Sequence, residues 1–234
     1  GSSAASDVYK RQTIENPAIA RLIGACVFPA GMAMVLIAGS ELFTGNNLII
    51  LACLEKKVTA GQMLKNWVTV FTGNFLGAAF VALMVVYGHI PDLYNGLLAQ
   101  KMVAAAVIRV NETFAEALIR GILCNILVCI AVWASFAAKK VSGKLMMSFW
   151  PVMIFVLCGF EHSIANMYYI PAGLLALGRP EYQGYIGAGE AAGPGLGSFL
   201  FGNLLPVTLG NIVGGVLVGS LFWFCYLKKA KHEA

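Results

Sequence analysis

Charged residues are scarce in this sequence, at 12% of 234 residues, against roughly 25% in an ordinary soluble domain. A soluble core of this size needs a charged shell, and the sequence has too few charged side chains to form one. This composition excludes a soluble binding module. The formal net charge of +5 is spread over short loops beside apolar segments. Since no single basic face is apparent, we expect no nucleic-acid partner.

Several chemical motifs are also absent. The six cysteines form no Cys-x-x-Cys pair, and no His-Glu-x-x-His run occurs. We therefore predict no metal site, no cofactor and no enzymatic activity. A membrane-embedded enzyme stays open as an alternative, but one intramembrane histidine and two glutamates would be a thin ligand set.

Long apolar runs dominate what is present, because 59% of the residues are hydrophobic. Five spans are predicted, at about 19–54, 67–87, 114–138, 145–177 and 204–227. A single crossing needs about 20 residues, so the first and fourth spans are too long. Each of these two is interrupted by glycine, glutamate and asparagine, which a bilayer tolerates only where the backbone is buried in protein or lines a cavity. The sequence predicts an all-α integral membrane protein with two broken helices that carries a small solute.

The two interruptions bear the same motif, Gly39-x-Glu41-x-x-x-x-Asn46 and Gly159-x-Glu161-x-x-x-x-Asn166. Each is followed by two asparagines eight residues apart, Asn66 and Asn74 in the first copy and Asn203 and Asn211 in the second. We interpret the chain as two half-repeats, about 13–110 and 111–227, within one channel domain at 13–234. A repeated three-span unit enters the membrane from opposite sides, which gives an inverted repeat.

The half-repeats are unequal, because the second has a plain span before its broken span and the first does not. We therefore expect a sixth span, a plain helix before residue 13. Residues 1–12 are predicted to be a cloning or assembly scar.

Lysines mark one side of the predicted membrane topology. They lie in the first, third and last connecting segments: Lys56, Lys57, Lys65, Lys139, Lys140, Lys144, Lys228, Lys229 and Lys231. Positively charged loops favour the cytoplasmic side. We expect a multi-pass protein of the plasma or inner membrane with a cytoplasmic C-terminus, and lipid as its surroundings.

Polar side chains at the breaks suggest two kinds of role. His162 is a histidine at membrane depth, which indicates function and allows proton exchange near neutral pH, although it could simply bond the broken backbone. Glu41 and Glu161, with Asn46 and Asn166, are predicted to support the breaks. On the third span, Glu116 and Arg120 are four residues apart and predict a local ion pair. Four apolar side chains near the breaks are candidate constrictions: Phe28, Met32, Phe43 and Phe155.

The segments Ala38–Asn46 and Gly159–Met167 resemble the signature motifs of the formate/nitrite transporter family. Further segments resemble its other motifs in order: Lys65-Asn66-Trp67 with Gly73-Asn74, Gly121-Ile-Leu-Cys-Asn125, and Pro206-Val-Thr-Leu-Gly-Asn211. The resemblance covers about 18–227.

This resemblance implies an aquaporin-like protomer of six helices, assembled as a homopentamer, that passes formate, nitrite or hydrosulfide. It implies that Thr44 faces His162 at the pore centre, with Asn125 and Asn211 nearby. The four candidate constriction residues match the family's constrictions, although Met32 stands where leucine is common. Arg109 matches a basic position that attracts anions to the vestibule. The segment 28–31 is similar to the formate and hydrosulfide branches.

The predicted mechanism has basic vestibules that concentrate a small monovalent anion. The anion then passes apolar constrictions and a central His/Thr site, with transient protonation near His162. A neutral-solute channel is the main alternative, but the breaks carry no Asn-Pro-Ala pair. An ammonium channel is a second, although it would favour two pore histidines.

Overall fold

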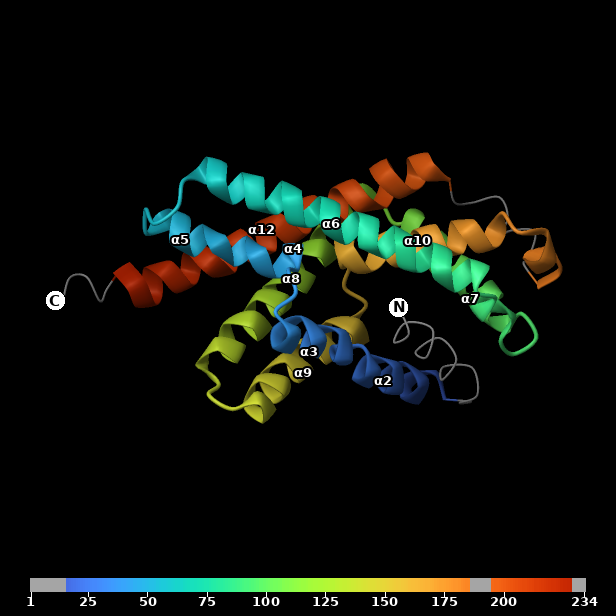
Figure 1. Cartoon of the computed structure of the whole chain (residues 1–234), viewed down its shortest axis with the longest axis horizontal. Helices are drawn as coiled ribbons and strands as arrows, with labels where there is room; N and C mark the ends of the chain where they lie inside the picture. The colour runs from blue at the N-terminus through green and yellow to red at the C-terminus, as the bar shows by residue number, and fades with distance from the viewer. Residues whose placement is uncertain (1–15, 186–194, 229–234) are drawn as a thin grey trace.

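The computed structural model describes residues 16–185 and 195–228, and every regular element within those ranges is a helix (Figure 1). The predicted scar at 1–12 and part of the insertion before the last span lie outside the described residues. Five helical segments are long and apolar enough to cross a membrane: Arg21–Ala38, Ala60–Tyr87, Phe114–Ala137, Val141–Cys158 and Ser198–Lys228. The prediction of five spans is confirmed, but the second begins seven residues earlier than expected.

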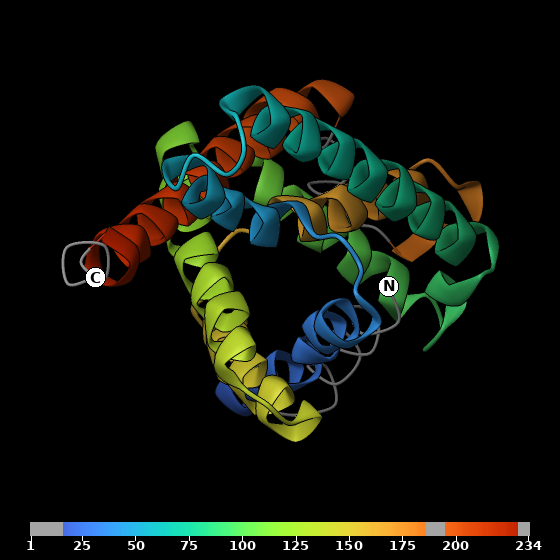
Figure 2. The same cartoon turned by 60° about the vertical axis from the view of Figure 1, so that its left-hand side comes forward.

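Both predicted broken spans are broken. In the first, helices α2 (Pro17–Val27) and α3 (Pro29–Ala38) end at a non-helical link, after which α4 (Phe43–Asn46), η1 (Asn47–Ile49) and α5 (Ile50–Leu54) continue. In the second, α9 (Val141–Cys158) ends at a similar link and α10 (Ser163–Leu177) follows. Figure 2 shows α2 and α3 lying across α9, and these elements are in contact.

The plain helices α6 (Ala60–Tyr87) and α8 (Phe114–Ala137) begin with the same kind of cap. In α8, the Thr113 hydroxyl accepts a bond from the Glu116 N–H, and the Glu116 carboxylate accepts one from the Thr113 N–H at 2.9 Å. This capping box satisfies two amides that the first turn leaves free. The predicted Glu116–Arg120 pair is therefore wrong, because Glu116 turns back to the cap and Arg120 pairs with Glu112 instead.

Helix α7 (Leu97–Val110) was not predicted. Its 14 residues reach roughly 21 Å at 1.5 Å per residue, which is too short for a full crossing. It packs on α10, which also contacts α6. One buried cluster joins these elements through Ala82, Leu98, Met102 and Ala172. The helix carries Arg109 in its last turn and therefore positions that side chain beside the second break.

Helices α8 and α12 (Leu205–Phe222) make the most extensive helix contact in the described chain. A Cβ atom added at Gly210 would lie 2.2 Å from the Leu118 carbonyl oxygen, and one at Gly214 would lie 2.4 Å from that of Ile122. Only glycine permits this backbone approach, which is a common means of helix association in membranes. A Cβ atom added at the repeat-related Gly73 or Gly77 of α6 would meet nothing within 4 Å in the described chain.

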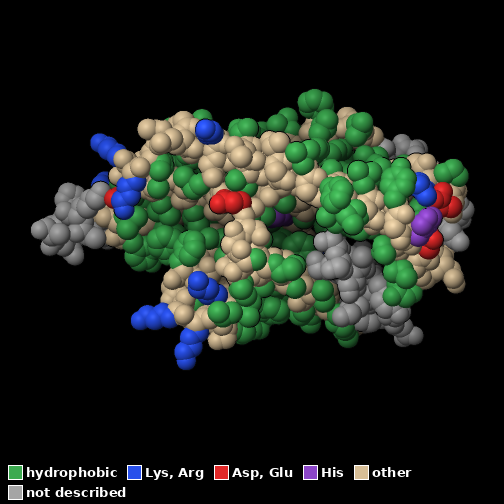
Figure 3. Space-filling view, viewed as in Figure 1, with side chains coloured by type: hydrophobic (Ala, Val, Ile, Leu, Met, Phe, Trp, Pro, Cys, Tyr) green, Lys and Arg blue, Asp and Glu red, His purple; other side chains and the backbone are tan. Residues whose placement is uncertain are grey.

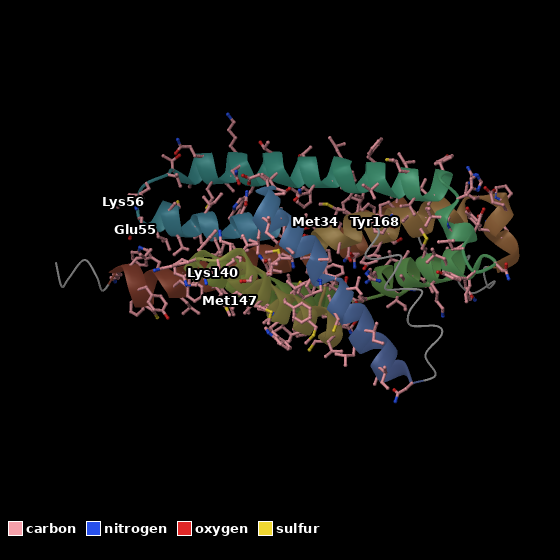
Figure 4. The ribbon with its side chains drawn as sticks, turned by 60° about the horizontal axis from the view of Figure 1, so that its bottom comes forward. Met34, Glu55, Lys56, Lys140, Met147 and Tyr168 are labelled. Carbon is pink, nitrogen blue, oxygen red and sulfur yellow. The ribbon has the colours of Figure 1, made fainter. Side chains whose placement is uncertain are left out.

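On the face drawn in Figure 3, hydrophobic side chains are spread along most of the length, most Lys and Arg side chains lie toward the left-hand end, and acidic side chains lie near the middle and at the right-hand end. Lys56 and Lys140, from different loops, lie at the same end, where the C-terminal π-helical segment η5 (Trp223–Lys228) also finishes (Figure 4). At that end the Glu55 carboxylate accepts a bond from the indole N–H of Trp223 at 2.7 Å. The lysine-rich loops therefore share one end, as the sequence predicts, although which side of the membrane they face stays a prediction.

Candidate functional site

The first break is held by side chains from within and beyond its motif. Gly39 ends α3 with φ 73°, the left-handed conformation that favours glycine. The Asn46 amide donates to the Glu41 carboxylate and to the Asn66 carbonyl oxygen, the latter at 2.9 Å. Asn74 accepts from the Phe43 N–H and donates to the Glu41 carbonyl, both at 3.0 Å. Asn74 thus supplies the bonds that the broken backbone lacks.

The second break repeats this arrangement residue by residue. Gly159 ends α9 with φ 73°. The Asn166 amide donates to the Glu161 carboxylate at 2.6 Å and to Asn203 at 2.8 Å. Asn211 accepts from the Ser163 N–H at 3.0 Å and donates to the Glu161 carbonyl at 3.1 Å. The shared spacing of glycine, glutamate and asparagine therefore yields one shared local geometry.

Thr44 and His162 bring the two breaks together. The Thr44 hydroxyl oxygen lies 3.0 Å from His162 Nε2, between residues 118 positions apart. The other ring nitrogen, Nδ1, accepts from the Ala165 N–H at 3.1 Å and caps α10. A neutral ring that accepts at Nδ1 carries its proton on Nε2, so His162 donates to Thr44. The threonine hydroxyl proton is then available to a third group.

Asn125 and Asn211 are buried behind this contact, and neither lines a cavity described below. The Asn125 amide donates to the Asn211 backbone carbonyl at 2.6 Å and to Asn47 at 2.8 Å. Asn211 also donates to the Gly121 carbonyl at 2.8 Å. The structure therefore places both asparagines near the central pair, as expected, but as supports of the surrounding backbone.

A central cavity of about 400 Å³ contains His162. Three of the predicted constriction residues, Phe28, Met32 and Phe155, line it. The Phe28 and Phe155 rings meet edge to face with centroids 5.6 Å apart, and Phe155 stacks on the His162 ring at 5.9 Å. The solute-accessible space next to the histidine is thus narrowed by aromatic side chains.

Phe43, the fourth predicted constriction residue, does not line this cavity. It packs against Trp67 and Phe71 in a buried cluster. Leu42 precedes it in an extended conformation, and successive side chains of an extended backbone point to opposite sides. Leu42 lines the cavity instead, so the position predicted for Phe43 belongs to its neighbour.

A second cavity, of about 510 Å³, adjoins the first at Phe28, Phe155 and His162. We call it the arginine vestibule. Its charged lining consists of Arg21, Arg109, Glu112, Arg120 and Glu161. Its polar, charged lining distinguishes it from the apolar central cavity. The three arginine side chains could attract an anion to this position beside the aromatic constriction.

Arg109, the residue that the family resemblance assigns to a vestibule, lines this cavity and is held closely by its neighbours. Its Nε donates to the Asn166 side chain at 3.1 Å and its Nη1 donates to the Ala105 carbonyl at 2.8 Å. The guanidinium lies 4.4 Å from the centre of the Tyr169 ring, and its Nε is 4.0 Å from the Glu161 carboxylate. Arg109 therefore ties α7 to the second break.

A third cavity, of about 390 Å³, meets the central one at Met32, Val35 and Leu42. Glu41 and Asn46 of the first break line it. The three cavities thus follow one another past the two breaks, with His162 shared by the first two. Neighbouring cavities in this series share lining residues, an arrangement that fits a transmembrane pathway.

Sequence reasoning missed Leu42 and Val128 in the central lining, and Glu112 and Arg120 in the vestibule. Leu42 had a signal, since it lies inside the first break between two predicted site residues. Val128 is one of two valines on the apolar helix α8, and nothing in its neighbourhood of the sequence distinguishes it.

Comparison with known proteins gives concordant results. A family model described as formate/nitrite transporter matches residues 2–225. The formate channel FocA of Haemophilus influenzae is 40% identical over 208 residues, which cover 87% of this chain and 73% of that protein. The formate channel BtFdhC of Bacillus thuringiensis is 36% identical, covering 90% and 75%. A solved structure of a pentameric formate channel with formate bound is 30% identical, with a TM-score of 0.83 and coverage of 96% and 92%.

Proposed function

Because this chain belongs to the formate/nitrite transporter family, we propose that formate is the anion it carries. It is a transmembrane anion channel of helical architecture, with five apolar spans in the described chain. Formate is supported by relatives named as formate channels. Nitrite and hydrosulfide are anions of similar size and charge, so a direct comparison is needed.

The observation that carries the proposal is the Thr44–His162 contact, which lies where the two breaks meet and beside the central cavity. An isolated charge at the centre of a bilayer costs several kcal/mol. Neutral hydrogen-bond donors lower this cost without trapping the anion. In the proposed mechanism, the arginine vestibule attracts formate, Phe28 and Phe155 remove its water, and the Thr44 hydroxyl donates to it.

Transient protonation of the anion near His162 is a further part of the proposal. Nε2 is the ring nitrogen that carries a proton toward Thr44, because Nδ1 accepts the Ala165 N–H. Protonation of Nδ1 from vestibule water, which breaks its bond to the Ala165 N–H, would let Nε2 pass its proton through Thr44 to formate and would leave the ring neutral. The neutral acid would then cross and release the proton on the far side. His162→Ala removes this route, so the rate and the pH dependence of flux should both change.

The control for that variant is His89→Ala. His89 lies in a loop, where its ring faces Asp92 at 3.3 Å, and its loss should leave flux unchanged. If His162→Ala retained the wild-type rate and pH dependence, proton transfer through this ring would be excluded.

The choice of anion is tested by parallel flux of formate, nitrite and hydrosulfide into proteoliposomes that contain the purified protein. We expect formate to be carried fastest. Nitrite or hydrosulfide flux well above formate flux would overturn the choice of anion. Osmotic swelling without flux of any of the three would contradict the proposed activity itself.

We also propose that the protein assembles as a homopentamer with one pore per protomer. The similar solved structure is described as pentameric, and many large apolar side chains lie exposed on a single chain, including Phe80, Phe136 and Phe201 at 62–70%. The mass of the detergent-solubilised particle, measured by light scattering, should correspond to five chains.

The lysine-rich end is proposed to be cytoplasmic, which places the C-terminus inside and the arginine vestibule outside. A membrane-impermeant thiol reagent should label Lys140→Cys in opened membranes but not in intact cells. Arg179→Cys, at the other end, should be labelled in both, relative to a background without exposed native cysteines.

A further inference from the structure

Arg109 and Arg120 differ in how fully their charges are engaged. Arg109 has two side-chain hydrogen bonds, a ring beneath its guanidinium and a nearby carboxylate. Arg120 has one side-chain partner among the described residues, the Glu112 carboxylate, and its side chain is 43% exposed. The guanidinium of Arg120 is therefore the more accessible positive group of this pair at the vestibule.

Glu112 is in an unusual position for a carboxylate. It lies in the short link between α7 and α8, yet its side chain is 6% exposed. One oxygen accepts from Arg120, while the other, Oε2, is buried with no hydrogen-bond partner in the described chain. A buried carboxylate oxygen without a partner is costly. The hydrogen-bonding capacity of Glu112 is therefore only partly satisfied by Arg120. Another carboxylate could replace Glu112 as the partner of Arg120 at little cost.

A small monovalent carboxylate has the same chemistry as the Glu112 side chain. Its two oxygens match the planar fork of an arginine guanidinium. We propose that Arg120 is an anion-binding residue of the arginine vestibule, and that Glu112 is an internal counter-ion which competes with the transported anion for it. This inference rests on the proposed function, because it takes formate as the ligand.

The charges around Glu112 determine how the competition depends on pH. Arg120 on α8, Arg109 on α7 and Glu161 in the second break act on it, and Arg21 and His162 line the same cavity. With both carboxylates ionised and His162 neutral, three guanidinium groups leave one net positive charge. Protonation of Glu112 raises that charge to two and releases Arg120.

Burial, together with the negative charge of Glu161, raises the pKa of Glu112 to about 7, against the opposing effects of Arg120 and Arg109. Below pH 7 the side chain is mainly protonated and Arg120 is free for an anion. Above pH 7 the carboxylate is ionised and pairs with Arg120. The vestibule should therefore hold formate more tightly on the acidic side of neutrality.

The test is formate uptake into proteoliposomes at pH 6 and pH 8, with the apparent KM measured for the wild type and for Glu112→Gln. The ratio of the two KM values isolates Glu112, because formate ionises equally in both experiments. We expect the wild-type KM to match that of the variant at pH 6. At pH 8 it should be roughly fivefold higher, as expected for one unit charge near contact in a water-filled space.

Glu116→Gln is the matched control. Glu116 lies four residues from Glu112, is exposed and bonds the cap of α8, a role that glutamine also fills. Its KM should follow the wild type at both pH values. Arg120→Gln supplies an independent arm: its KM should be roughly fivefold above the wild type at pH 6 and close to it at pH 8.

Two results separate the inference from the proposed function. Wild-type formate uptake with a Glu112→Gln KM equal to wild type at both pH values would overturn the inference and leave the function intact. Should Glu112→Gln fail to assemble, an Arg120→Gln KM equal to wild type at pH 6 would overturn it equally. A wild type with no uptake above protein-free liposomes would overturn the function, and the inference with it.

Discussion

The two breaks share a local geometry but differ in their surroundings. Gly39 and Gly159 have the same φ, and each break has the same glutamate–asparagine and asparagine–backbone bonds. Yet Glu161 is 6% exposed, whereas Glu41 is exposed. The repeated motif therefore determines the backbone geometry of each break, while the helices packed around the break determine how far its side chains are exposed to water.

Two pairs of positions that differ between the breaks lie at the central cavity or at the contact beside it. In the repeat, His162 corresponds to Leu42 and Thr44 corresponds to Ile164. Leu42, His162 and Ile164 line the central cavity. Thr44 does not line it but contacts the His162 ring. Each break therefore contributes one polar and one apolar side chain to the centre. Polar bonding and water exclusion are combined there in a way that neither half supplies alone.

The largest difference between the breaks is expected for their clamping asparagines. Asn211→Ala leaves the Ser163 N–H and the Glu161 and Gly121 carbonyls without a partner in a fully buried site, which costs roughly 3 kcal/mol or more. Asn74→Ala removes two bonds in a half-buried site and should cost about 1–2 kcal/mol. Thermal unfolding in detergent measures both. Equal melting temperatures for the two variants would contradict the difference in burial.

The next effect concerns the polar contact between the breaks. Thr44→Val keeps the side-chain shape but leaves the His162 Nε2–H without its acceptor, and formate flux should fall by roughly tenfold, as for a lost buried hydrogen bond. Thr44→Ser should retain most of the flux. The repeat-related change Ile164→Val tests the apolar counterpart and should alter flux by less than about twofold. A Thr44→Val channel with wild-type flux would remove this contact from the mechanism.

Replacement of the helix-ending glycines should produce a smaller difference between the two breaks. Gly39→Ala and Gly159→Ala both place a side chain at positive φ, at a cost of about 1–2 kcal/mol. A Cβ atom at Gly159 would also lie 2.5 Å from the Arg21 guanidinium, whereas one at Gly39 meets nothing within 4 Å. Both variants should lose similar stability, but only Gly159→Ala should raise the KM for formate, because it displaces Arg21. An unchanged KM would show that Arg21 has no part in attracting the anion.

The smallest effect is expected for the two glutamates. Glutamine keeps the bond to Asn166 or Asn46 while removing the charge. Glu161→Gln removes a negative charge 4.0 Å from Arg109, and the KM for formate should fall by roughly twofold. Glu41→Gln alters an exposed group that water screens, and its KM should stay at the wild-type value. A larger change for Glu41→Gln would indicate that the third cavity contributes to anion attraction.

The same comparison extends to the helices that follow the breaks. A Cβ atom added at Gly210 or Gly214 of α12 would clash with the backbone of α8. A Cβ atom added at Gly73 or Gly77 of α6 would meet nothing within 4 Å in the described chain. The sequence pattern is equal in the two halves, so the difference lies in what each helix contacts.

Much of this protein was determined by the sequence alone. The lengths of the apolar runs predict the spans, and the glycine–glutamate–asparagine spacing predicts the breaks. Both are local, since Glu161 and Asn166 are only five residues apart and the backbone geometry between them brings their side chains together. The vestibule position of Arg109 was implied by the family resemblance and not by the local pattern, and Arg109 lines the second cavity.

The contacts between side chains that lie far apart in the sequence became known only from the tertiary structure. Thr44 and His162 are 118 residues apart. Arg120 pairs with Glu112 and not with Glu116, because the Glu116 carboxylate is bonded to the Thr113 cap. Leu42 replaced Phe43 in the pore because the extended link turned them to opposite sides. Local spacing acts through the regular period of the backbone, whereas these contacts depend on how whole helices pack, which no short segment of the sequence contains.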